Sequence, residues 1–218
     1  MFRSTDTTLQ IRQYFRRALT KSRFTVDRGG HRTLELLGAH FVADKPAIFG
    51  KPNEAYIERE TAWYDSMSLN VNDMGDPPTQ WCATANDAGE INSNYGYLVY
   101  SARNGSQYQN VLAELRSNPD SRRATMIYTR PSMWRDYNMH GKNDFVCTNA
   151  VTYYIRDDQL HCVVQMRSND VVYGYKNDRA WQKTVLDRLA QDLEVKPGRI
   201  IWQVQNLHVY ERHFGLIR

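Results

Sequence analysis

The stretch MRSNDVVYGYKND, residues 166–178, decides the fold that we predict for this chain. It continues the β-rich run QLHCVVQM, residues 159–166, which is typical of a strand. After it, apolar side chains recur every three or four positions, which indicates an amphipathic helix over about residues 178–193. Pro197 and Gly198 are expected to stop that helix. The stretch therefore predicts a strand followed directly by a long helix.

Helical and strand patterns alternate along the rest of the chain. Helical spacing of apolar residues predicts helices over about residues 6–20, 54–66 and 106–115. Runs of β-branched and aromatic residues predict strands over residues 33–43, 124–129, 147–155 and 199–210. Gly38 interrupts the first of these strands and suggests a bend or bulge, and residues 156–158 are expected to form a hairpin turn. Strands with helices packed on them predict an α+β architecture.

Length and composition favour one globular domain. The 218 residues are 41% hydrophobic and 24% charged, which suffices for a substantial core. No repeat or linker-like tract divides the sequence, so we expect a single domain over residues 1–218. The net charge of +4 is small and evenly spread, which argues against a dedicated nucleic-acid binder and favours a small anionic ligand.

The sequence gives no sign of a membrane span, a signal peptide or a metal site. No apolar run approaches the roughly 18 residues that a spanning helix needs. The first 15 residues lack the apolar core of a signal peptide, so we expect a cytoplasmic location. The three cysteines, Cys82, Cys147 and Cys162, show neither CxxC nor Cys/His ligand spacing. We therefore expect neither a disulfide framework nor a bound metal.

Glu60 stands among apolar residues on the predicted helix over residues 54–66. Its inward stripe also contains Tyr56, Trp63 and Tyr64. A glutamate there could be a buried structural residue that is bonded to a neighbouring helix or an arginine. Alternatively, burial could raise the pKa of its carboxyl group and suit it to proton transfer near neutral pH.

Cys147 opens a predicted strand after a polar stretch. It could be an inert core thiol, or a nucleophilic thiolate with cationic neighbours that lower its pKa. Arg122, Arg123 and Arg167 could supply such cations, or could be solvated surface residues. Three guanidinium groups together would also form a cradle for phosphate, with Ser168 as a further donor.

These residues fall into motifs that resemble the thymidylate synthase family. Residues 166–178 match its RSxDxxxGxxxN signature through Arg167, Ser168, Asp170 and Gly174. NPDSRR resembles the family's arginine pair, ExxW its catalytic-glutamate helix and NLHVY its sugar-binding strand. The motifs occur in the family's order and cover nearly the whole chain. His208 and Tyr210, which share one strand face and could be ordinary packing by spacing alone, belong to the last of them.

The resemblance implies a fold and an assembly. The fold would be thymidylate synthase-like, a mixed β-sheet with packed helices. Two copies would pair sheet to sheet as a homodimer, with Arg122 and Arg123 reaching the phosphate of the other subunit. The chain ends at Arg218, where relatives continue with a tail that closes over the folate, so this tail is expected to be short or absent.

The resemblance also implies site roles. Cys147 would attack C6 of the pyrimidine, and Glu60, through ordered water, would move protons during addition and elimination. Tyr95 matches the family's catalytic tyrosine beside the thiol. The co-substrate would be 5,10-methylenetetrahydrofolate. The remaining expected contacts are with phosphate (Arg28, Arg122, Arg123, Arg167, Ser168), sugar (His208, Tyr210) and folate (Trp81, Asp170), and Asn149 is expected in the substrate site two residues after the thiol.

One departure from the signature concerns the base. Asp178 occupies the place of the family's Asn. A carboxyl group can accept from the N4 amino group of cytosine and, when protonated, donate to N3, whereas an Asn amide suits uracil. Asp178 therefore indicates a branch of the family that hydroxymethylates dCMP, in which water quenches the C5 methylene. Action on dUMP or CMP, and a non-catalytic relative that binds RNA or joins a phage nucleotide-synthesis complex, are the alternatives.

Overall fold

A computed structural model describes residues 6–27 and 29–218 of the chain. These residues form two compact units. The first, which we call the sheet unit, comprises residues up to Asn53 and from Ile155 onward. The second, which we call the helical unit, runs from Glu54 to Tyr154. Arg28, which was expected to contact phosphate, lies outside the described residues.

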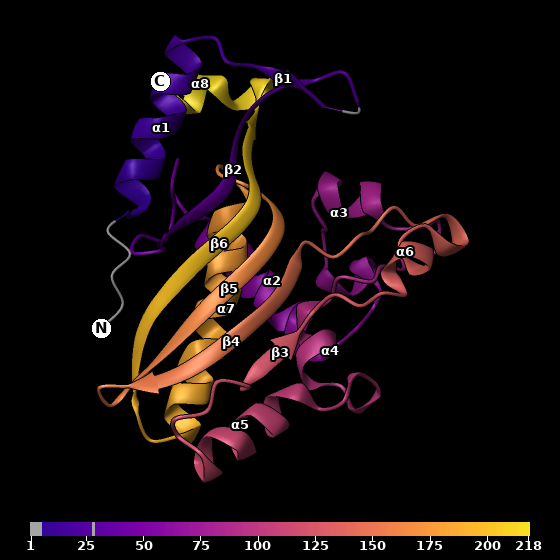
Figure 1. Cartoon of the computed structure of the whole chain (residues 1–218). Helices are drawn as coiled ribbons and strands as arrows, with labels where there is room; N and C mark the ends of the chain where they lie inside the picture. Colours follow the sequence, from indigo (N-terminus) through magenta and orange to yellow (C-terminus); the bar gives the residue numbers. More distant parts are fainter. Residues whose placement is uncertain (1–5, 28) are drawn as a thin grey trace. The chain divides into compact units, whose positions relative to one another are not determined.

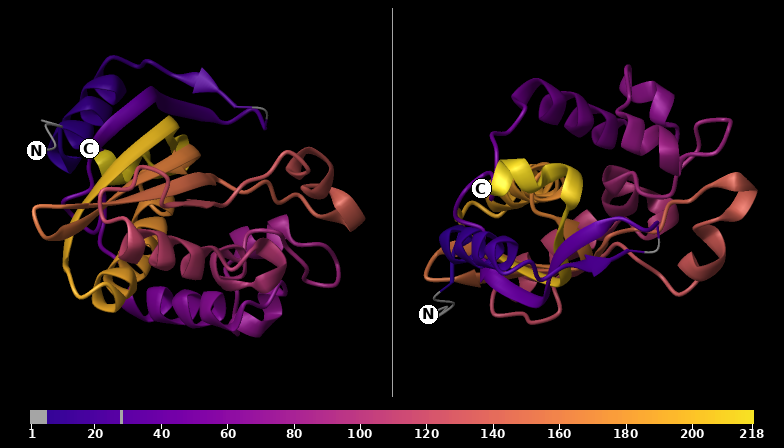
Figure 2. Two further views of the ribbon diagram at one scale, coloured as in Figure 1. Left: turned by 60° about the horizontal axis from the view of Figure 1, so that its bottom comes forward. Right: turned by 90° about the horizontal axis from the view of Figure 1, so that it is seen from above.

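Four strands and a long helix organise the sheet unit (Figure 1). The strands lie in the order β1-β2-β6-β5, with β2 antiparallel and β5 parallel to β6. The sheet is therefore mixed, as predicted. Helix α7 packs along β5 and β6, which Figure 2 shows from two further directions. The bounds are β1 Thr25–Val26, β2 Arg32–Val42, β5 Gln159–Asp170, β6 Lys196–Tyr210 and α7 Gly174–Asp192.

Two shorter helices and a one-turn segment complete the sheet unit. They are α1 Thr8–Thr20, η4 Glu211–His213 and α8 Phe214–Ile217. Helix α1 starts where the sequence predicts it, because Thr7 and Gln10 form a reciprocal capping box that satisfies free N–H groups of the first turn. The core of this unit contains the fully buried side chains of Phe15, Leu34, Phe41, Tyr175, Trp181 and Trp202.

Gly38 produces a bend in β2 and not a bulge. Its φ of +69° lies in the left-handed region, which glycine adopts without strain. The register with β6 is the same on both sides, with Leu37 opposite Asn206 and Ala39 opposite Val204, so no residue is inserted. The expected interruption is thus confirmed as a bend.

Helix α7 begins earlier than the apolar periodicity predicts, at Gly174 and not near residue 178. The Asp170 Oδ1 atom accepts the backbone N–H groups of Val172, at 2.9 Å, and Tyr173, at 2.6 Å. This local turn reverses the chain directly after β5, so the helix starts at once. The polar residues of its first turn hide this start from a pattern based on apolar spacing.

The expected stop signal of α7 was also wrong. The helix ends at Asp192, and Glu194 adopts a left-handed conformation with φ of +57°. Pro197 and Gly198 belong instead to β6, beside a register shift in its pairing with β5. A proline is tolerated at such a place because the regular hydrogen-bond ladder is already interrupted there.

The helical unit contains five helices, three one-turn segments and a strand pair among its described elements. The predicted helices over residues 54–66 and 106–115 are confirmed, and β3 pairs antiparallel with β4. The bounds are α2 Glu54–Ser66, η1 Val71–Met74, α3 Thr79–Thr84, α4 Tyr95–Tyr100, η2 Ala102–Asn104, α5 Gln107–Ser117, β3 Thr125–Ile127, α6 Met133–Asp136, η3 Met139–Gly141 and β4 Thr148–Arg156.

Helix α4 was not predicted, because its sequence YGYLVY has the composition of a strand. The side chain of Asn94 caps it by accepting the backbone N–H of Tyr97 at 2.8 Å. Gly96 allows a close approach to α2, since a Cβ atom at this position would lie 1.8 Å from the Tyr64 carbonyl oxygen. Tertiary packing thus determines this helix and, with it, the place of Tyr95.

Candidate active site

Cys147 lies directly before β4 in the helical unit and is half-buried. Its Sγ atom lies 3.9 Å from the carbonyl oxygen of Phe145. The backbone beyond it is anchored, because the carbonyl oxygen of Asn149 accepts N–H groups from the segment that follows β3. Cys162 differs, since full burial raises the pKa of its thiol to about 12 and makes it inert. Position and access therefore single out Cys147 over Cys162 as a nucleophile.

Tyr95 is held next to the strand that follows Cys147. Its hydroxyl oxygen accepts a hydrogen bond from Thr148 Oγ1 at 3.0 Å. Its ring stacks on Tyr64, with centroids 5.4 Å apart, and meets Tyr128 edge-on at 5.2 Å. Only 4% of Tyr95 is exposed, so these contacts fix the hydroxyl group beside the residue after the thiol.

Glu60 is buried in the helical unit, as its place on the apolar stripe predicts. The hydroxyl group of Tyr56 and the indole N–H of Trp81, at 3.0 Å, both donate to its Oε1 atom. Burial raises the pKa of this carboxyl group, and the two neutral donors oppose that effect only in part. Both of these donors are uncharged, so the group suits proton transfer near neutral pH.

The packing of α2 connects Glu60 with Tyr95. Tyr64 follows Glu60 by one turn of the helix and stacks on Tyr95. Trp63 contacts the ring of Trp81 edge-on, with centroids 5.1 Å apart. One helix thus supports the buried carboxyl group, its indole partner and the tyrosine beside the thiol. Glu60 and Tyr95, two predicted catalytic residues of the helical unit, share this framework.

Arg122 and Arg123 lie in the loop after α5 and are exposed. The Arg123 side chain is 80% exposed, and its Nε lies 2.9 Å from Glu114 Oε1. Hydrogen bonds from Ser121 and Arg123 lower the pKa of Glu114. This anchor presents the arginine pair toward solvent. Their predicted contact with phosphate, and their sharing between subunits, stay predictions.

In the sheet unit, the expected phosphate and sugar contacts lie at the same end of two parallel strands. Arg167 and Ser168 are half-buried near the end of β5, and Asp170 pairs in register with His208 of β6. The rings of His208 and Tyr210 meet edge-on, with centroids 5.1 Å apart. The parallel register therefore brings the signature motif and the strand motif together.

The two carboxylate oxygens of Asp170 have different surroundings. Its Oδ1 forms the turn before α7, as described above. Its Oδ2 is buried and has no hydrogen-bond partner among the residues that the structure describes. A buried acceptor without a partner is costly unless a ligand or water supplies a donor. This oxygen therefore fits the N–H donors of a folate ring.

Asp178 lies in the second turn of α7, and its Oδ2 accepts a hydrogen bond from Asn169 Nδ2 at 2.7 Å. Asn169 is buried, and its Oδ1 accepts the indole N–H of Trp202 at 3.2 Å. Asn169 is not among the site residues that the sequence predicts, because the family signature leaves its position unspecified. Only the folded strand shows that this side chain contacts the carboxyl group at position 178.

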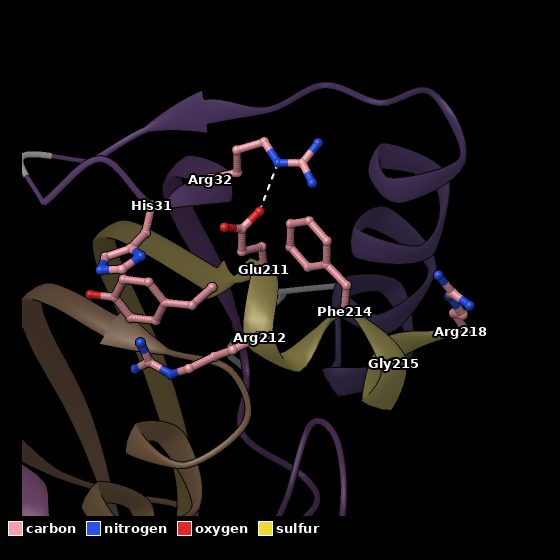
Figure 3. A pocket seen from close by; sticks show the side chains of 8 residues that line it. His31, Arg32, Glu211, Arg212, Phe214, Gly215 and Arg218 are labelled. Carbon is pink, nitrogen blue, oxygen red and sulfur yellow. Dashed lines mark hydrogen bonds and ion pairs between the residues drawn. The ribbon is translucent and has the colours of Figure 1, made fainter.

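A separate pocket of about 520 Å³ lies at the end of β6 (Figure 3). Arg32 and Glu211 form an ion pair of 2.7 Å beside it, and Phe214 borders it. The guanidinium group of Arg212 lies 4.4 Å from the ring centre of Tyr210, which also lines the pocket. The pocket therefore borders the expected sugar contact but is not lined by the signature motif.

No helix in the described part of the chain is long and apolar enough to span a membrane. Across residues 6–27 and 29–218, no group of three or more His, Cys, Asp or Glu side chains is arranged to hold a metal ion.

The half-buried cysteine before a strand and the buried glutamate of the helical unit are groups of the kind that covalent nucleophilic catalysis uses. The arginine and serine of the signature motif are donors of the kind that bind phosphate. The chain belongs to the thymidylate synthase family, whose model matches residues 10–218. Enzymes of this family bind nucleotide and folate substrates and use methylenetetrahydrofolate as the one-carbon donor.

The chain is similar to enzymes of two kinds. The chain is 52% identical over 225 aligned residues to the deoxycytidylate 5-hydroxymethyltransferases of enterobacteria phages T4 and T2, covering 100% of this chain and 92% of each relative. It is 27% identical over 203 residues to the thymidylate synthase of Buchnera aphidicola from Acyrthosiphon pisum (strain APS), covering 88% of this chain and 75% of that enzyme. The resemblance stated from the motifs is thus confirmed.

Proposed function

We propose that this chain is a deoxycytidylate 5-hydroxymethyltransferase. It transfers the methylene group of 5,10-methylenetetrahydrofolate to C5 of dCMP, and water completes the reaction to give 5-hydroxymethyl-dCMP and tetrahydrofolate. The observation that carries this proposal is Asp178 in place of the family's Asn, in a chain that matches the phage hydroxymethyltransferases over its whole length.

Asp178 recognises the cytosine base of the nucleotide. Cytosine presents an N3 acceptor beside an N4 amino donor, so a neutral carboxyl group satisfies both by donating to N3 and accepting from N4. Uracil presents an N3–H donor beside an O4 acceptor, which an Asn amide satisfies in one fixed arrangement, whereas an ionised Asp178 would leave O4 facing a second acceptor. The buried Asn169 contact supports this assignment, because it holds the carboxyl group in one orientation.

Cys147 supplies the nucleophile. Its thiolate forms a bond to C6, the C5=C6 pair forms a new C4=C5 bond, and the C4=N3 pair takes a proton from Asp178 at N3. C5 thereby becomes electron-rich and can attack a one-carbon electrophile. Bound methylenetetrahydrofolate supplies that carbon. The orphaned Oδ2 of Asp170 and the half-buried ring of Trp81 fit contacts with a folate.

Glu60 and Tyr95 assist the proton transfers at C5 and at the Cys147 thiol. The raised pKa of Glu60 leaves a protonated fraction at higher pH than an ordinary glutamate, so it can both accept and return a proton through ordered water. After C5 has bonded to the one-carbon unit, the C5 proton is lost through the ordered water of Glu60. The carbon–nitrogen bond to the folate then breaks, its electron pair and a proton go to tetrahydrofolate, and an exocyclic methylene remains at C5. Water adds its oxygen to this methylene and gives up a proton. Departure of the Cys147 sulfur from C6 then restores the C5=C6 bond, and N3 returns its proton to Asp178.

Arg167 and Ser168 hold the phosphate, and Arg122 and Arg123 complete the cradle from a second copy of the chain. His208 and Tyr210 bind the 3'-hydroxyl of the sugar, and Asn149 lines the substrate site. The exposure of the arginine pair supports a role in a homodimer. Because the relatives are phage enzymes, we place the action of this chain in a host cytoplasm. A place in a phage nucleotide-synthesis complex is a further part of the proposal.

Product analysis tests this proposal against its alternatives. The enzyme is incubated with methylenetetrahydrofolate and with dCMP, dUMP or CMP in turn. Formation of 5-hydroxymethyl-dCMP supports the proposal. A methylated or hydroxymethylated dUMP, or hydroxymethyl-CMP alone, would reassign the substrate. No product, together with a gel shift on RNA and no tritium release from [5-3H]dCMP, would identify a non-catalytic binding protein.

A further inference from the structure

Asn169 connects Asp178 to the core of the sheet unit. Its Nδ2 donates to Asp178 Oδ2 at 2.7 Å, and its Oδ1 accepts from Trp202 Nε1 at 3.2 Å. An indole N–H can only donate, so the amide oxygen must face Trp202 and the amide nitrogen must face Asp178. A buried donor thus fixes which end of the amide meets the carboxyl group.

The packing around this contact leaves little room for another arrangement. Asn169 is 4% exposed and Trp202 is fully buried. Gly174 lies one helical turn before Asp178, and a Cβ atom there would lie 3.0 Å from Asn169 Nδ2 and 3.7 Å from Asp178 Oδ2. The glycine of the signature motif therefore leaves space for the amide and for the contact.

The Asn169 contact must strengthen during the proposed reaction. An N–H group that donates to a carboxyl group favours the ionised form over the neutral form. Asp178 is neutral when cytosine binds and becomes a carboxylate when N3 takes its proton. An interaction that is stronger in the transition state than in the ground state raises the rate of the chemical step more than the affinity.

We propose that Asn169 is a positioning residue of this reaction. It holds the Asp178 carboxyl group in one plane and stabilises the carboxylate that remains after proton transfer, and Oδ2, the oxygen that it contacts, serves N3. When the C6–Sγ bond forms, the π electron pair of C5=C6 becomes the second bond of C4=C5. The π electron pair of C4=N3 then binds the proton of Asp178 at N3, and the electron pair of the O–H bond stays on Oδ2. The reverse transfer accompanies release of the thiol. This inference rests on the proposed function.

The test separates kcat from KM for dCMP in the full-length enzyme, with tritium release from [5-3H]dCMP as a second readout. Asn169→Ala should lower kcat about 10- to 100-fold and change KM less than about threefold. Trp202→Phe keeps Asn169 but removes the indole N–H that donates to its amide oxygen. This variant should also lower kcat, but by a smaller factor than Asn169→Ala. Tyr175→Phe is the control, because it removes an equally buried hydrogen bond of α7, to Lys45, and should change kcat less than about twofold.

Different results overturn different claims. If wild-type enzyme produces 5-hydroxymethyl-dCMP but Asn169→Ala raises KM alone, or loses no more kcat than Tyr175→Phe, then Asn169 has only a structural role. If Asn169→Ala does not fold, an unchanged kcat for Trp202→Phe would likewise show that Asn169 has only a structural role. If wild-type enzyme produces no 5-hydroxymethyl-dCMP, the proposed function itself fails, and this inference fails with it.

Discussion

Replacing Asp178 with asparagine should change the base that the enzyme prefers. The buried Asn169 N–H lies 2.7 Å from Asp178 Oδ2, so an amide at position 178 would place its oxygen there and its NH₂ group at the other position. By the assignment of Oδ2 to N3, that oxygen would face the acceptor N3 of cytosine. The NH₂ group would face the N4 amino donor. Both contacts would be mismatched for cytosine and matched for uracil.

The size of the change follows from two unpaired polar groups. Each buried group without a partner costs about 1–3 kcal/mol, so two cost about 2–6 kcal/mol. At about 1.4 kcal/mol per factor of ten, the ratio of kcat/KM for dCMP over dUMP should fall roughly 30-fold to 10⁴-fold. Arg167 and Ser168 are untouched, so the affinity for 2-deoxyribose 5-phosphate, which lacks the base, should not change.

Steady-state kinetics with dCMP and dUMP measure this ratio, and calorimetric titration with 2-deoxyribose 5-phosphate serves as the control. Asp187→Asn is a matched control variant, because it makes the same exchange on α7 at an exposed i,i+4 ion pair with Lys183. It should leave the ratio unchanged. An Asp178→Asn enzyme that prefers dCMP by the wild-type margin would refute the reasoning and place base recognition elsewhere.

Three further substitutions test the catalytic residues. Cys147→Ser should lower turnover at least about 10³-fold and leave dCMP affinity within about threefold, because an alcohol is scarcely ionised at neutral pH; substantial product formation would contradict covalent catalysis. Inactive Arg123→Ala and Cys147→Ser chains, mixed and shown to form heterodimers, should recover part of the activity, and no recovery would return the arginine to its own subunit. Because burial raises the pKa of Glu60 above 4.5, its charged form destabilises the fold as pH rises. Glu60→Gln should therefore lose activity but melt at a higher temperature than wild type at neutral pH. This gain in melting temperature should vanish below about pH 4.5. An equal gain in melting temperature at neutral pH and below pH 4.5 would show that Glu60 is not buried in its charged form.

The elements that the sequence predicted well have strong periodicity or a recognisable motif. The inward stripe of α2 correctly placed Glu60 in an apolar environment, and the strand pattern correctly paired His208 with Tyr210 on one face. These features depend on local spacing, which a sequence displays directly.

The features that the sequence did not reveal depend on contacts between distant segments. Helix α4 has the composition of a strand, and its packing against α2 through Gly96 determines its structure. The early start of α7 follows from a turn built by Asp170. Asn169 occupies a position that the signature leaves open, and its role follows from contacts with Trp202 and Asp178. Periodicity carries no information on such contacts.

The oxygen source of the product tests the central claim most directly. Wild-type enzyme is incubated with dCMP and methylenetetrahydrofolate in water enriched in oxygen-18, and the nucleotide and folate products are analysed by mass spectrometry. The account predicts 5-hydroxymethyl-dCMP that carries oxygen-18 in its hydroxymethyl group, together with tetrahydrofolate in equal amount. A 5-methyl nucleotide accompanied by dihydrofolate, or a product formed only from dUMP, would contradict it.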